Sequence, residues 1–515
     1  THLNPNVTWW RDAGAFLLYL NRSQFLLQQG QPVADVLYYY GDNVPNFVRL
    51  KRDDPARALP GFDYDVTNTD ALLHRISFDS GVIRTRGGIS YRALVLPRSR
   101  ILPLAALEVA QRYVVGGGIL IGERPLRSQG IVSDEDARRF ASIADALWSR
   151  CEQSAGEDAD HRVAIGRGQL YCTQSARAAL VAAGVLPDFE TTRDRADSLD
   201  YVHRRAGSKD IYFIRNTQPR ALEAAVTLRV ADKQPEMFDA VTGEVRQTLL
   251  FRATADRRTT LALSLEPYGS VFVVFRHAAA KNPVTRIVRD GAVLYSALDS
   301  VTEPGHLALP DGLTVQMKHG VAEMKTPLAG EYEVAFKDGT VKRAHATERN
   351  DYDFMGPWAL SFPANWGAPP KLELDRLASW TQSSDPGVRY FSGTATYRTT
   401  MRLDAAQLVA SHDWMLDLGE VRELAAVRIN GKPAQVLWKD PFSVRVDSLL
   451  HPGDNSVEID VTNFWPNRLI GDAQSPEGKH YTWTNIRAYT KDSPLLPSGL
   501  LGPVVLRPVY QVSLQ

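Results

Sequence analysis

The chain has 515 residues, of which 44% are hydrophobic and 23% charged, a composition typical of globular protein with three or four domains. Lys plus Arg and Asp plus Glu both number 59, so the net charge is zero. This balance argues against nucleic acid or an anionic membrane surface as a partner, because both favour a basic protein surface. No apolar run approaches the roughly 18 residues that a membrane span needs, so membrane insertion is not expected.

The chain contains two cysteines, Cys151 and Cys172. Two are too few for a disulfide framework. They either pair with each other or remain as two buried thiols, and the sequence leaves both readings open. The first residue is Thr and no signal peptide is visible, so this end of the chain does not indicate a compartment.

Residues 1–41 predict a loop, a long amphipathic helix and a buried strand. Ala13, Phe16, Leu17 and Leu20 share one helix face at three- and four-residue spacing, and Leu27 continues it. Gly30 stands where a helix C-cap is expected, and Pro32 prevents continuation. Since nothing before this helix covers its apolar face, we expect the folding unit to begin upstream of residue 1.

From residue 33 to about 200, short apolar runs alternate with helical patterns. This order predicts a parallel sheet with helices on both faces, in a flavodoxin-like α/β domain. The expected strands are 33–40, 93–97 and 119–122; the expected helices are 101–115, 145–151 and 175–183.

After residue 200 the helical period disappears and alternation at every second residue takes over. Segments within 201–278 predict a small antiparallel β-sandwich, 279–350 a small β-domain or linker hairpins, and 351–515 a jelly-roll-like sandwich. The fold class expected is therefore multidomain, α/β followed by all-β.

The motifs argue against two kinds of chemistry: phosphate binding by a glycine-rich loop and catalysis by a cysteine nucleophile. The GGGILIGE run at 116–123 lacks both the Gly-Lys-Ser/Thr ending and the GxGxxG spacing of phosphate loops, so it is interpreted as a helix end leading into a strand. Cys151 lies in a helical pattern and Cys172 in a strand-like one, and neither fits a nucleophile placed on a strand-to-helix turn.

Several segments together carry a family resemblance. They are His2–Asn4–Thr8–Trp9–Trp10, Tyr19–Asn21–Arg22, LLQQG at 26–30, DVLYYYG at 35–41, TNFWPNRLIGD at 462–472 and LPSGLLGP at 496–503. In these segments the chain resembles the α-L-rhamnosidases of glycoside hydrolase family 106. FSGTATY at 391–397, with the turns that follow, resembles the galactose-binding-like modules of glycosidases.

The resemblance implies a domain order. Residues 1–32 would be the last loop and helix of a (β/α)8-type catalytic barrel, most of which lies outside this chain. Residues 33–200 would be the flavodoxin-like domain, 201–278 the small sandwich, 279–350 the hairpin region and 351–515 the galactose-binding-like sandwich.

The resemblance also implies an activity, the hydrolysis of terminal α-L-rhamnosyl residues from glycosides or polysaccharides by an inverting carboxylate pair. It further implies calcium in the missing barrel and a periplasmic or secreted bacterial location. No Glu precedes Glu108, so neither catalytic residue is assigned to this chain, and it holds no identifiable cofactor motif. The alternatives are a non-catalytic carbohydrate-binding accessory protein and part of a β-galactosidase-like glycosidase. The oligomeric state is not indicated.

The candidate substrate-binding residues lie near the N-terminus. His2, Asn4 and Asn6 offer hydrogen bonds, and Trp9 and Trp10 offer flat faces for a pyranose ring, although both tryptophans are also expected to pack in a barrel wall. Asp42 and Asn43 follow the 33–40 strand, where ligands of parallel sheets bind, but they equally suit a capped turn before Pro45.

A second polar and aromatic set lies in the last domain. It is interpreted either as a carbohydrate-binding face or as an interface between domains. Its members are Trp465, Asn467, Arg468, Asp472, Trp483, Asn485 and Tyr489.

Overall fold

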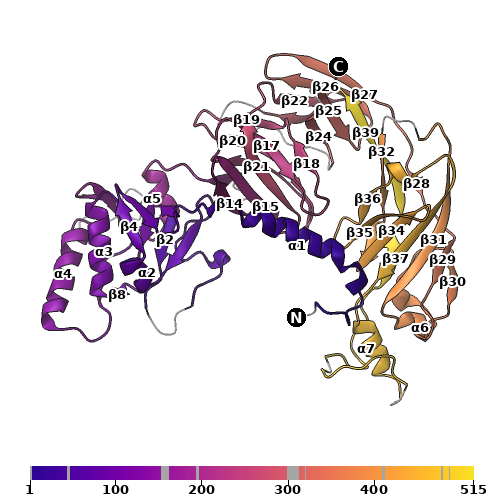
Figure 1. Ribbon diagram of the computed structural model, residues 1–515, viewed down its shortest axis with the longest axis horizontal. Helices are drawn as coiled ribbons and strands as arrows, with labels where there is room; N and C mark the ends of the chain where they lie inside the picture. Colours follow the sequence, from indigo (N-terminus) through magenta and orange to yellow (C-terminus); the bar gives the residue numbers. More distant parts are fainter. Residues whose placement is uncertain are drawn as a thin grey trace. The chain divides into compact units, whose positions relative to one another are not determined.

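The computed structural model describes residues 3–42, 47–151, 162–192, 197–297, 312–318, 321–408, 412–476, 479–486 and 488–514. The chain divides into two compact units (Figure 1). The first unit contains Thr1–Phe25, Asp239–Leu250 and Lys281–Gln515; the second contains Leu26–Phe238 and Phe251–Ala280. Most of the regular structure is β-sheet, largely antiparallel, which confirms a β-rich multidomain fold. None of the helices within the described ranges combines the length and apolar character that a membrane crossing needs.

The second unit contains a six-stranded sheet in the order β11-β12-β9-β7-β2-β3, and the five strands from β12 to β3 are parallel. Numbered along the chain, these five lie in the order 2-1-3-4-5. Their bounds are β2 (Val36–Tyr39), β3 (Tyr64–Thr67), β7 (Ala93–Val95), β9 (Ile119–Ile121) and β12 (Gly168–Tyr171), with β11 (Arg162–Ile165) antiparallel at the edge.

Helices cover both faces of this sheet, as the alternation of the sequence predicts. Leu37 and Tyr39 of β2 pack in one core with α2 (Thr69–His74), α3 (Leu104–Val115) and α4 (Asp134–Trp148). Val36 and Tyr38 point to the other face, where they share a core with α5 (Ala176–Ala182). Strands buried on both faces explain why β2 appears in the sequence as a continuous apolar run.

Two helices differ from the sequence prediction at their first residues. The helix expected at 145–151 is the end of α4, whose first turn carries Asp134, Glu135 and Asp136 and whose N-cap, Ser133, accepts a hydrogen bond from the Asp136 N–H (3.1 Å). Acidic residues and a serine cap both stabilise a helix N-terminus. The helix expected at 101–115 begins at Leu104 instead, because residues 101 and 102 form β8 (Ile101–Leu102), which pairs with β10 (Arg127–Ser128).

A small three-stranded sheet also belongs to this unit and was absent from the sequence prediction. It is formed by β4 (Ile76–Asp79), β5 (Val82–Thr85) and β6 (Ser90–Tyr91), in that order. Its strands are short, and most of their side chains are partly or fully exposed, so the hydrophobic pattern is weak.

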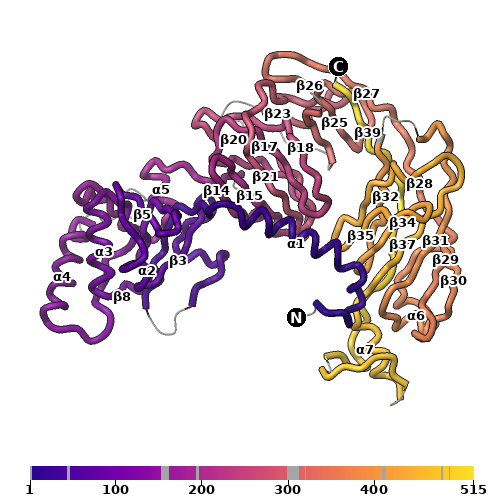
Figure 2. The backbone as a smooth tube through the Cα atoms, viewed as in Figure 1, coloured from indigo at the N-terminus to yellow at the C-terminus, as the bar shows by residue number. Residues whose placement is uncertain are grey.

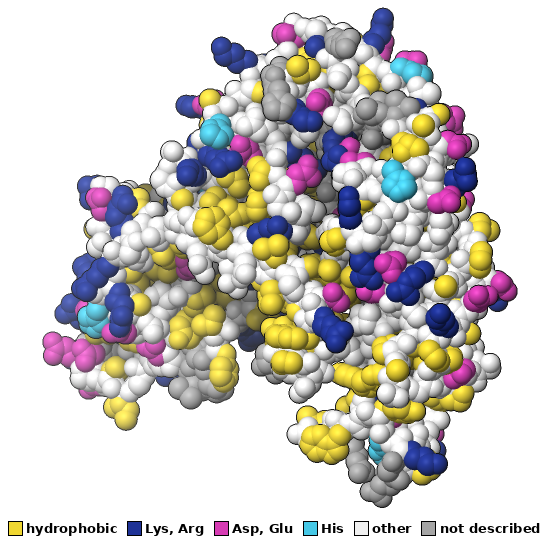
Figure 3. Space-filling model, turned by 45° about the vertical axis from the view of Figure 1, so that its right-hand side comes forward, with side chains coloured by type: hydrophobic (Ala, Val, Ile, Leu, Met, Phe, Trp, Pro, Cys, Tyr) yellow, Lys and Arg dark blue, Asp and Glu magenta, His cyan; other side chains and the backbone are white. Residues whose placement is uncertain are grey.

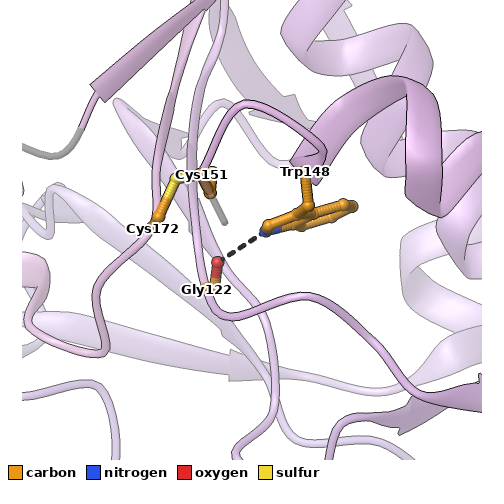
Figure 4. The surroundings of a disulfide bond; sticks show 4 residues. All are labelled: Gly122, Trp148, Cys151 and Cys172. Atoms are coloured by element: carbon orange, nitrogen blue, oxygen red, sulfur yellow. Dashed lines mark hydrogen bonds between the residues drawn. A yellow bond between two sulfur atoms is a disulfide. The ribbon is translucent and has the colours of Figure 1, made fainter. Parts of the chain in front are cut away.

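Cys151 and Cys172 form a disulfide, so the alternative of two buried thiols is wrong (Figure 4). Their Cα atoms are 6.0 Å apart. The bond joins the end of α4 to the segment after β12. Beside it, the indole N–H of Trp148 donates to the Gly122 carbonyl (2.9 Å), so α4 is attached to the sheet by two links.

A β-sandwich completes the second unit. One sheet has the order β1-β14-β15-β21-β17 and the other β13-β16-β20-β19. Their bounds are β1 (Gln31–Pro32), β13 (Phe189–Thr191), β14 (Leu199–Ala206), β15 (Lys209–Asn216), β16 (Leu222–Leu228), β17 (Lys233–Phe238), β19 (Phe251–Ala253), β20 (Thr259–Leu265) and β21 (Ser270–Ala278). Alternate residues of both sheets form the core, among them Tyr212, Val226 and Leu263.

The pairing of the short strand β1 with β14 depends on Gly30. Gly30 has φ +57°, and a Cβ there would lie 2.0 Å from the Arg205 carbonyl oxygen, so both the conformation and the space exclude a side chain. The guanidinium of Arg204 donates to the carbonyls of Gln29 (2.7 Å) and Gly30 (2.8 Å). The glycine expected to end the first helix therefore also permits the chain to join the sandwich.

The first unit contains a four-stranded sheet and a larger sandwich. The four-stranded sheet has the order β23-β22-β26-β27, and the sandwich pairs the sheet β24-β25-β39-β32-β36 with β30-β29-β31-β37-β34-β35. The bounds are β18 (Val245–Gln247), β22 (Val284–Arg289), β23 (Ala292–Ser296), β24 (Thr314–Lys318), β25 (Val321–Thr326), β26 (Gly330–Phe336), β27 (Val341–Ala346), β28 (Tyr352–Asp353), β29 (Trp358–Ser361), β30 (Lys371–Leu374), β31 (Thr394–Leu403), β32 (His412–Asp417), β33 (Glu420–Arg422), β34 (Leu424–Ile429), β35 (Lys432–Leu437), β36 (Ser443–Arg445), β37 (Gly453–Thr462), β38 (Gly499–Gly502) and β39 (Val505–Ser513).

This sandwich has a single continuous core. Trp414 and Leu416 of β32 face Tyr397 of β31 and Ile459 of β37 across it, and all four are buried. Short helices α6 (Pro386–Arg389) and α7 (Pro466–Asp472) follow loops at its margin. The alternation of buried and solvent-facing residues at 414–418 and 457–461 confirms the strands expected there.

Candidate functional site

The N-terminal segment of the first unit forms a tight turn before α1 (Ala13–Leu27). The side-chain oxygen of Asn4 accepts from the Asn6 N–H (2.9 Å), and its carbonyl accepts from the Val7 N–H (3.2 Å). A short 3-10 turn, Trp10–Asp12, then leads into the helix. Asn4 is thus committed in part to holding the turn, while Asn6 is exposed.

The two tryptophans of this segment have different surroundings. Trp9 is half-buried and meets Phe16 edge-on at 6.3 Å, and Phe16 in turn meets Trp438 at 5.1 Å. Tyr19 also lies against Trp438, at 5.3 Å. Trp10 is 38% exposed. Trp9 therefore belongs to a packed aromatic cluster, and only Trp10 presents a free face.

The expected apolar face of α1 is only partly buried within the described residues of the unit. Ala13 and Ser23 are buried, and Arg22 donates to the carbonyls of Ala240 (3.1 Å) and Val241 (2.7 Å). Leu17, predicted on the apolar face, is 37% exposed. The side that packs is therefore set by Ala13, Phe16 and Tyr19, not by Leu17.

The segment before α7 contacts the N-terminal turn directly. The indole N–H of Trp465 donates to the Asn6 carbonyl (2.8 Å), and its ring lies 5.8 Å from that of Trp366. Figure 2 shows the backbone near the N-terminus close to the segment that leads into α7. Of the expected site residues, Asn6 is thus joined to Trp465, which the sequence placed in a separate cluster, while Trp9 packs through Phe16 toward Trp438. Trp366 and Trp438 were missed, and only their being tryptophans between strands could have suggested them.

A buried ion pair shapes the loop that follows α7. Arg468 and Asp472 are 3.1 Å apart and almost fully buried. Asp472 also accepts from the N–H of Thr482 (2.9 Å) and from its hydroxyl (2.6 Å), and the Arg468 guanidinium lies 4.8 Å from the ring centre of Tyr481. The Asp472 carboxylate thereby fixes both the backbone and the side chain of Thr482, ten positions further along the chain.

This loop presents aromatic and aliphatic side chains to solvent. Trp483 is 86% exposed, and Phe464, Tyr481 and Ile486 are also exposed. Figure 3 shows hydrophobic side chains on this part of the surface, at the lower end of the view. Asn467 instead points inward, where its amide group bonds Leu496 and Ser498, so it supports the loop and is not available to a ligand.

Two half-buried carboxyl groups of the first unit have altered acidity. Burial and then the charge of Asp460 raise the pKa of Asp12, against the opposing charges of Arg11 and Arg428. Burial also raises the pKa of Glu423. The charge of Arg422 acts to lower this pKa, and the charge of Asp440 acts to raise it further. A carboxyl that keeps its proton is the property of a general acid. Neither residue is among those that line the cavity formed by α2, β3 and the β5–β6 turn, and we assign them no catalytic role.

Asp42 lies in the second unit, at the carboxyl end of β2, where it serves the protein's own hydrogen bonding. Its carboxylate accepts from the hydroxyl of Thr69, which also shares a hydrogen bond with the Tyr39 hydroxyl (2.7 Å). Burial raises the pKa of Tyr39 to about 12, so this group stays protonated. His2 and Asn43, the remaining candidates, lie outside the described residues.

The calcium that the resemblance implies finds no fitting ligand set here. Within the described ranges, no three His, Cys, Asp or Glu side chains are grouped so that they hold a metal ion. Calcium needs six to eight oxygen ligands. We therefore assign no metal to these residues.

Comparison with known proteins identifies relatives of both the sequence and the fold. A family model described as alpha-L-rhamnosidase matches residues 1–252. A rhamnosidase from Novosphingobium sp. PP1Y matches 99% of this chain with a TM-score of 0.75 and 30% identity. A putative beta-glucuronidase from Formosa agariphila is 24% identical over 100% of this chain.

The chain spans 42% of the Novosphingobium rhamnosidase and 58% of the Formosa protein. A beta-D-glucuronidase from Dictyoglomus thermophilum matches only 32% of this chain, with 18% identity and a TM-score of 0.24, which is too low to support an argument. Residues 1–252 of the chain are thus similar to the alpha-L-rhamnosidases of glycoside hydrolase family 106.

Proposed function

We propose that this chain forms part of an α-L-rhamnosidase that hydrolyses terminal α-L-rhamnosyl residues of a glycoside or polysaccharide. The observation that carries the proposal is the rhamnosidase fold match over 99% of the chain at a TM-score of 0.75, combined with the family match over 1–252. Because the chain spans 42% of that rhamnosidase, the remaining part of such an enzyme is available to supply a catalytic barrel.

In this proposal the acid and the base are carboxylates of the barrel, set apart for inversion, and any calcium is held there too. The coverage of the relatives supports placing the catalytic pair outside these residues, because the chain spans 42% of the Novosphingobium rhamnosidase. In this proposal the 515 residues supply the scaffold that holds the N-terminal turn, α1 and the loop after α7 that carries Trp483.

We also propose fold types for two domains, the α/β domain of the second unit and the final sandwich of the first unit. The strand order 2-1-3-4-5 with helices on both faces supports a flavodoxin-like domain. The final sandwich is proposed as a galactose-binding-like jelly roll whose margin carries the Trp465 and Trp483 segments. Trp10, Asn6 and Trp483 are the described side chains best placed for contact with a sugar, because they are exposed while their neighbours hold the scaffold.

A periplasmic or secreted location is part of the proposal. Disulfides persist mainly in oxidising compartments, and the Cys151–Cys172 bond supports such a site of action.

Hydrolysis of p-nitrophenyl α-L-rhamnopyranoside tests the activity, with the 515-residue chain and the complete gene product assayed in parallel. We expect turnover by the complete product and none by the 515 residues alone. Turnover by the 515 residues would overturn the placement of the catalytic pair. Proton NMR of the first-formed rhamnose anomer then distinguishes inversion from retention.

A second candidate is β-glucuronidase activity, favoured by the name of the Formosa relative that matches the whole chain. Assay of the complete product on p-nitrophenyl β-D-glucuronide decides between the two. Hydrolysis of the glucuronide without the rhamnoside would replace the rhamnosidase proposal.

A further inference from the structure

A cavity of about 390 Å³ lies in the second unit, away from the residues discussed so far. It is lined by parts of β2, β3, α2, β4 and the turn between β5 and β6. Of these elements, Figure 2 labels β3, α2 and β5. Leu37, Val66, Ala71 and Ile76 contribute apolar surface. Its volume is that of a small-molecule site.

The polar part of the lining is unusual because it contains two arginines and no carboxylate. Arg75 and Arg86 line the cavity together with the hydroxyl-bearing side chains of Thr67, Thr85 and Tyr91. A guanidinium offers donors in a planar fork that matches a carboxylate. The lining thus combines a surface for a sugar ring, hydroxyl partners and two guanidinium groups.

Nearby carboxylates do not neutralise both arginines. The Arg75 Nε donates to Asp70 (2.8 Å), so one carboxylate pairs with Arg75 and orients its guanidinium. Asp65, beside the cavity, accepts from the Tyr91 hydroxyl (2.8 Å). None of the ion pairs formed among the described residues involves Arg86.

Arg86 is presented by a closed turn. The Thr85 N–H donates to the Ile89 carbonyl (2.9 Å), and the Ile89 N–H donates to the Thr85 hydroxyl (3.1 Å). The Gly88 N–H closes the turn onto the Thr85 carbonyl (3.1 Å), and Gly88 has φ +90°, which favours glycine. The backbone that carries Arg86 is therefore ordered before any ligand arrives, which reduces the entropy lost on binding.

We propose that this cavity binds a uronic acid residue of a saccharide, with Arg86 and Arg75 holding the carboxylate and the threonine and tyrosine hydroxyls facing the ring hydroxyls. The apolar floor receives the C–H face of the ring. This binding site is separate from the proposed rhamnosidase activity and does not depend on it.

Isothermal titration of the 515-residue chain with D-glucuronate, L-rhamnose and inorganic sulfate tests the proposal. We expect saturable binding of glucuronate, no binding of rhamnose at the same concentration and no displacement of glucuronate by equimolar sulfate. Absence of glucuronate binding, or sulfate binding as tight as glucuronate, would overturn it, the latter because the site would then recognise charge alone.

The matched variants are R86A and R84A. Arg84 lies on β5 of the same hairpin and is exposed like Arg86, but it is paired with Asp79 (3.7 Å) and does not line the cavity. R86A is expected to weaken glucuronate binding at least tenfold, R86K less, and R84A not at all. Equal affinities of R86A and R84A would contradict the assignment. Rhamnoside hydrolysis by the complete product is expected to be unchanged in R86A, so failure of either proposal is distinguishable from failure of the other.

Discussion

Both carboxylate oxygens of Asp188 lie 3.0 Å from Nδ1 of His203, and the two side chains are fully buried in the sandwich of the second unit. Asp210 lies 3.2 Å from Nε2 on the other side of the ring, and Arg229 pairs with Asp188 at 3.3 Å. An imidazole with a carboxylate at each nitrogen satisfies both only when it carries two protons. The geometry therefore describes a buried imidazolium within a set of coupled charges.

Asp188→Asn should destabilise the second unit strongly, because it leaves His203 with one carboxylate and Arg229 without this partner. Breaking a buried ion pair on one side costs about 3–5 kcal/mol. Urea unfolding monitored by tryptophan fluorescence measures the loss. Asp79→Asn is the control, since the exposed Asp79–Arg84 pair should contribute less than about 1 kcal/mol. Equal losses for the two variants would contradict the role given to Asp188.

Stability should fall as the pH rises through the folded pKa of His203. Burial opposes the charged ring, but Asp188 and Asp210 outweigh it and raise the pKa of His203. A raised histidine pKa means that the stabilisation is complete below the unfolded value of about 6.5 and is lost above the folded value. Calorimetric Tm values between pH 6 and pH 9 test this. His203→Gln should remove this component of the slope, and parallel profiles for the variant and the wild type would exclude it.

Asp12→Asn should leave the first unit as stable as before or slightly more stable at pH 8, by up to about 0.5 kcal/mol. Burial and Asp460 raise the pKa of Asp12, so the folded protein holds this proton to a higher pH than the unfolded chain and loses stability as the carboxyl ionises. The gain should shrink as the pH falls and vanish only below the unfolded value of 3.8, where both states hold the proton. Asp404→Asn, at an exposed carboxylate, should show neither effect in the same urea titrations.

Trp438→Ala should release α1 from the sandwich of the first unit. The ring contacts Phe16 at 5.1 Å and Tyr19 at 5.3 Å, and removing a packed tryptophan costs about 3–5 kcal/mol. We expect faster hydrogen exchange of the amides of residues 13–25. Trp483→Ala, where the ring is 86% exposed, should leave that exchange unchanged. Unaltered exchange in Trp438→Ala would mean that other contacts hold the helix.

Reduction of the Cys151–Cys172 disulfide should lower the stability of the second unit by about 2–4 kcal/mol, since the bond closes a short loop with 21 residues of sequence separation. Thermal unfolding with and without tris(2-carboxyethyl)phosphine measures the difference. The double variant Cys151→Ser/Cys172→Ser should unfold at the reduced protein's temperature under both conditions. A reductant effect that persists in the double variant would point to another cause.

The sequence predicted correctly those elements that bury one or both of their faces completely. The strand at 36–39 is apolar at every position, and the hairpin of β14 and β15 is separated by a short turn at Gly207, so their patterns are unambiguous. The start of α4 was missed because its first turn is acidic and its apolar face begins only at Phe140. Ser133 and Asp136 were the available signal, since a serine with an acid three residues later marks a helix N-terminus.

The candidate site was only partly predictable. Local sequence placed Asn4, Asn6, Trp9 and Trp10 together, but the partners Trp366, Trp438 and Trp465 lie more than 350 positions away, and no local period connects them. His203 lies in the segment 201–278, for which the sequence predicts a small antiparallel sandwich, and the structure places it on the hairpin of β14 and β15. Its role depends on Asp188 and Asp210 meeting it across strands, which requires the register of β14 with β15.

Strand β39, formed by Val505–Ser513, lies between β25 and β32 in its sheet, and β28 also pairs with it. β25 ends at Thr326, so its neighbour in the sheet is synthesised about 180 residues later. During translation, the first unit cannot complete this sheet until residues 505–513 have left the ribosome, and β25 and β32 must remain unpaired along these edges until then. Unpaired strand edges attract other chains. The nascent first unit is thus exposed to misassembly while these roughly 180 residues are made, and chaperone demand should concentrate on the interval between the emergence of β25 and that of β39.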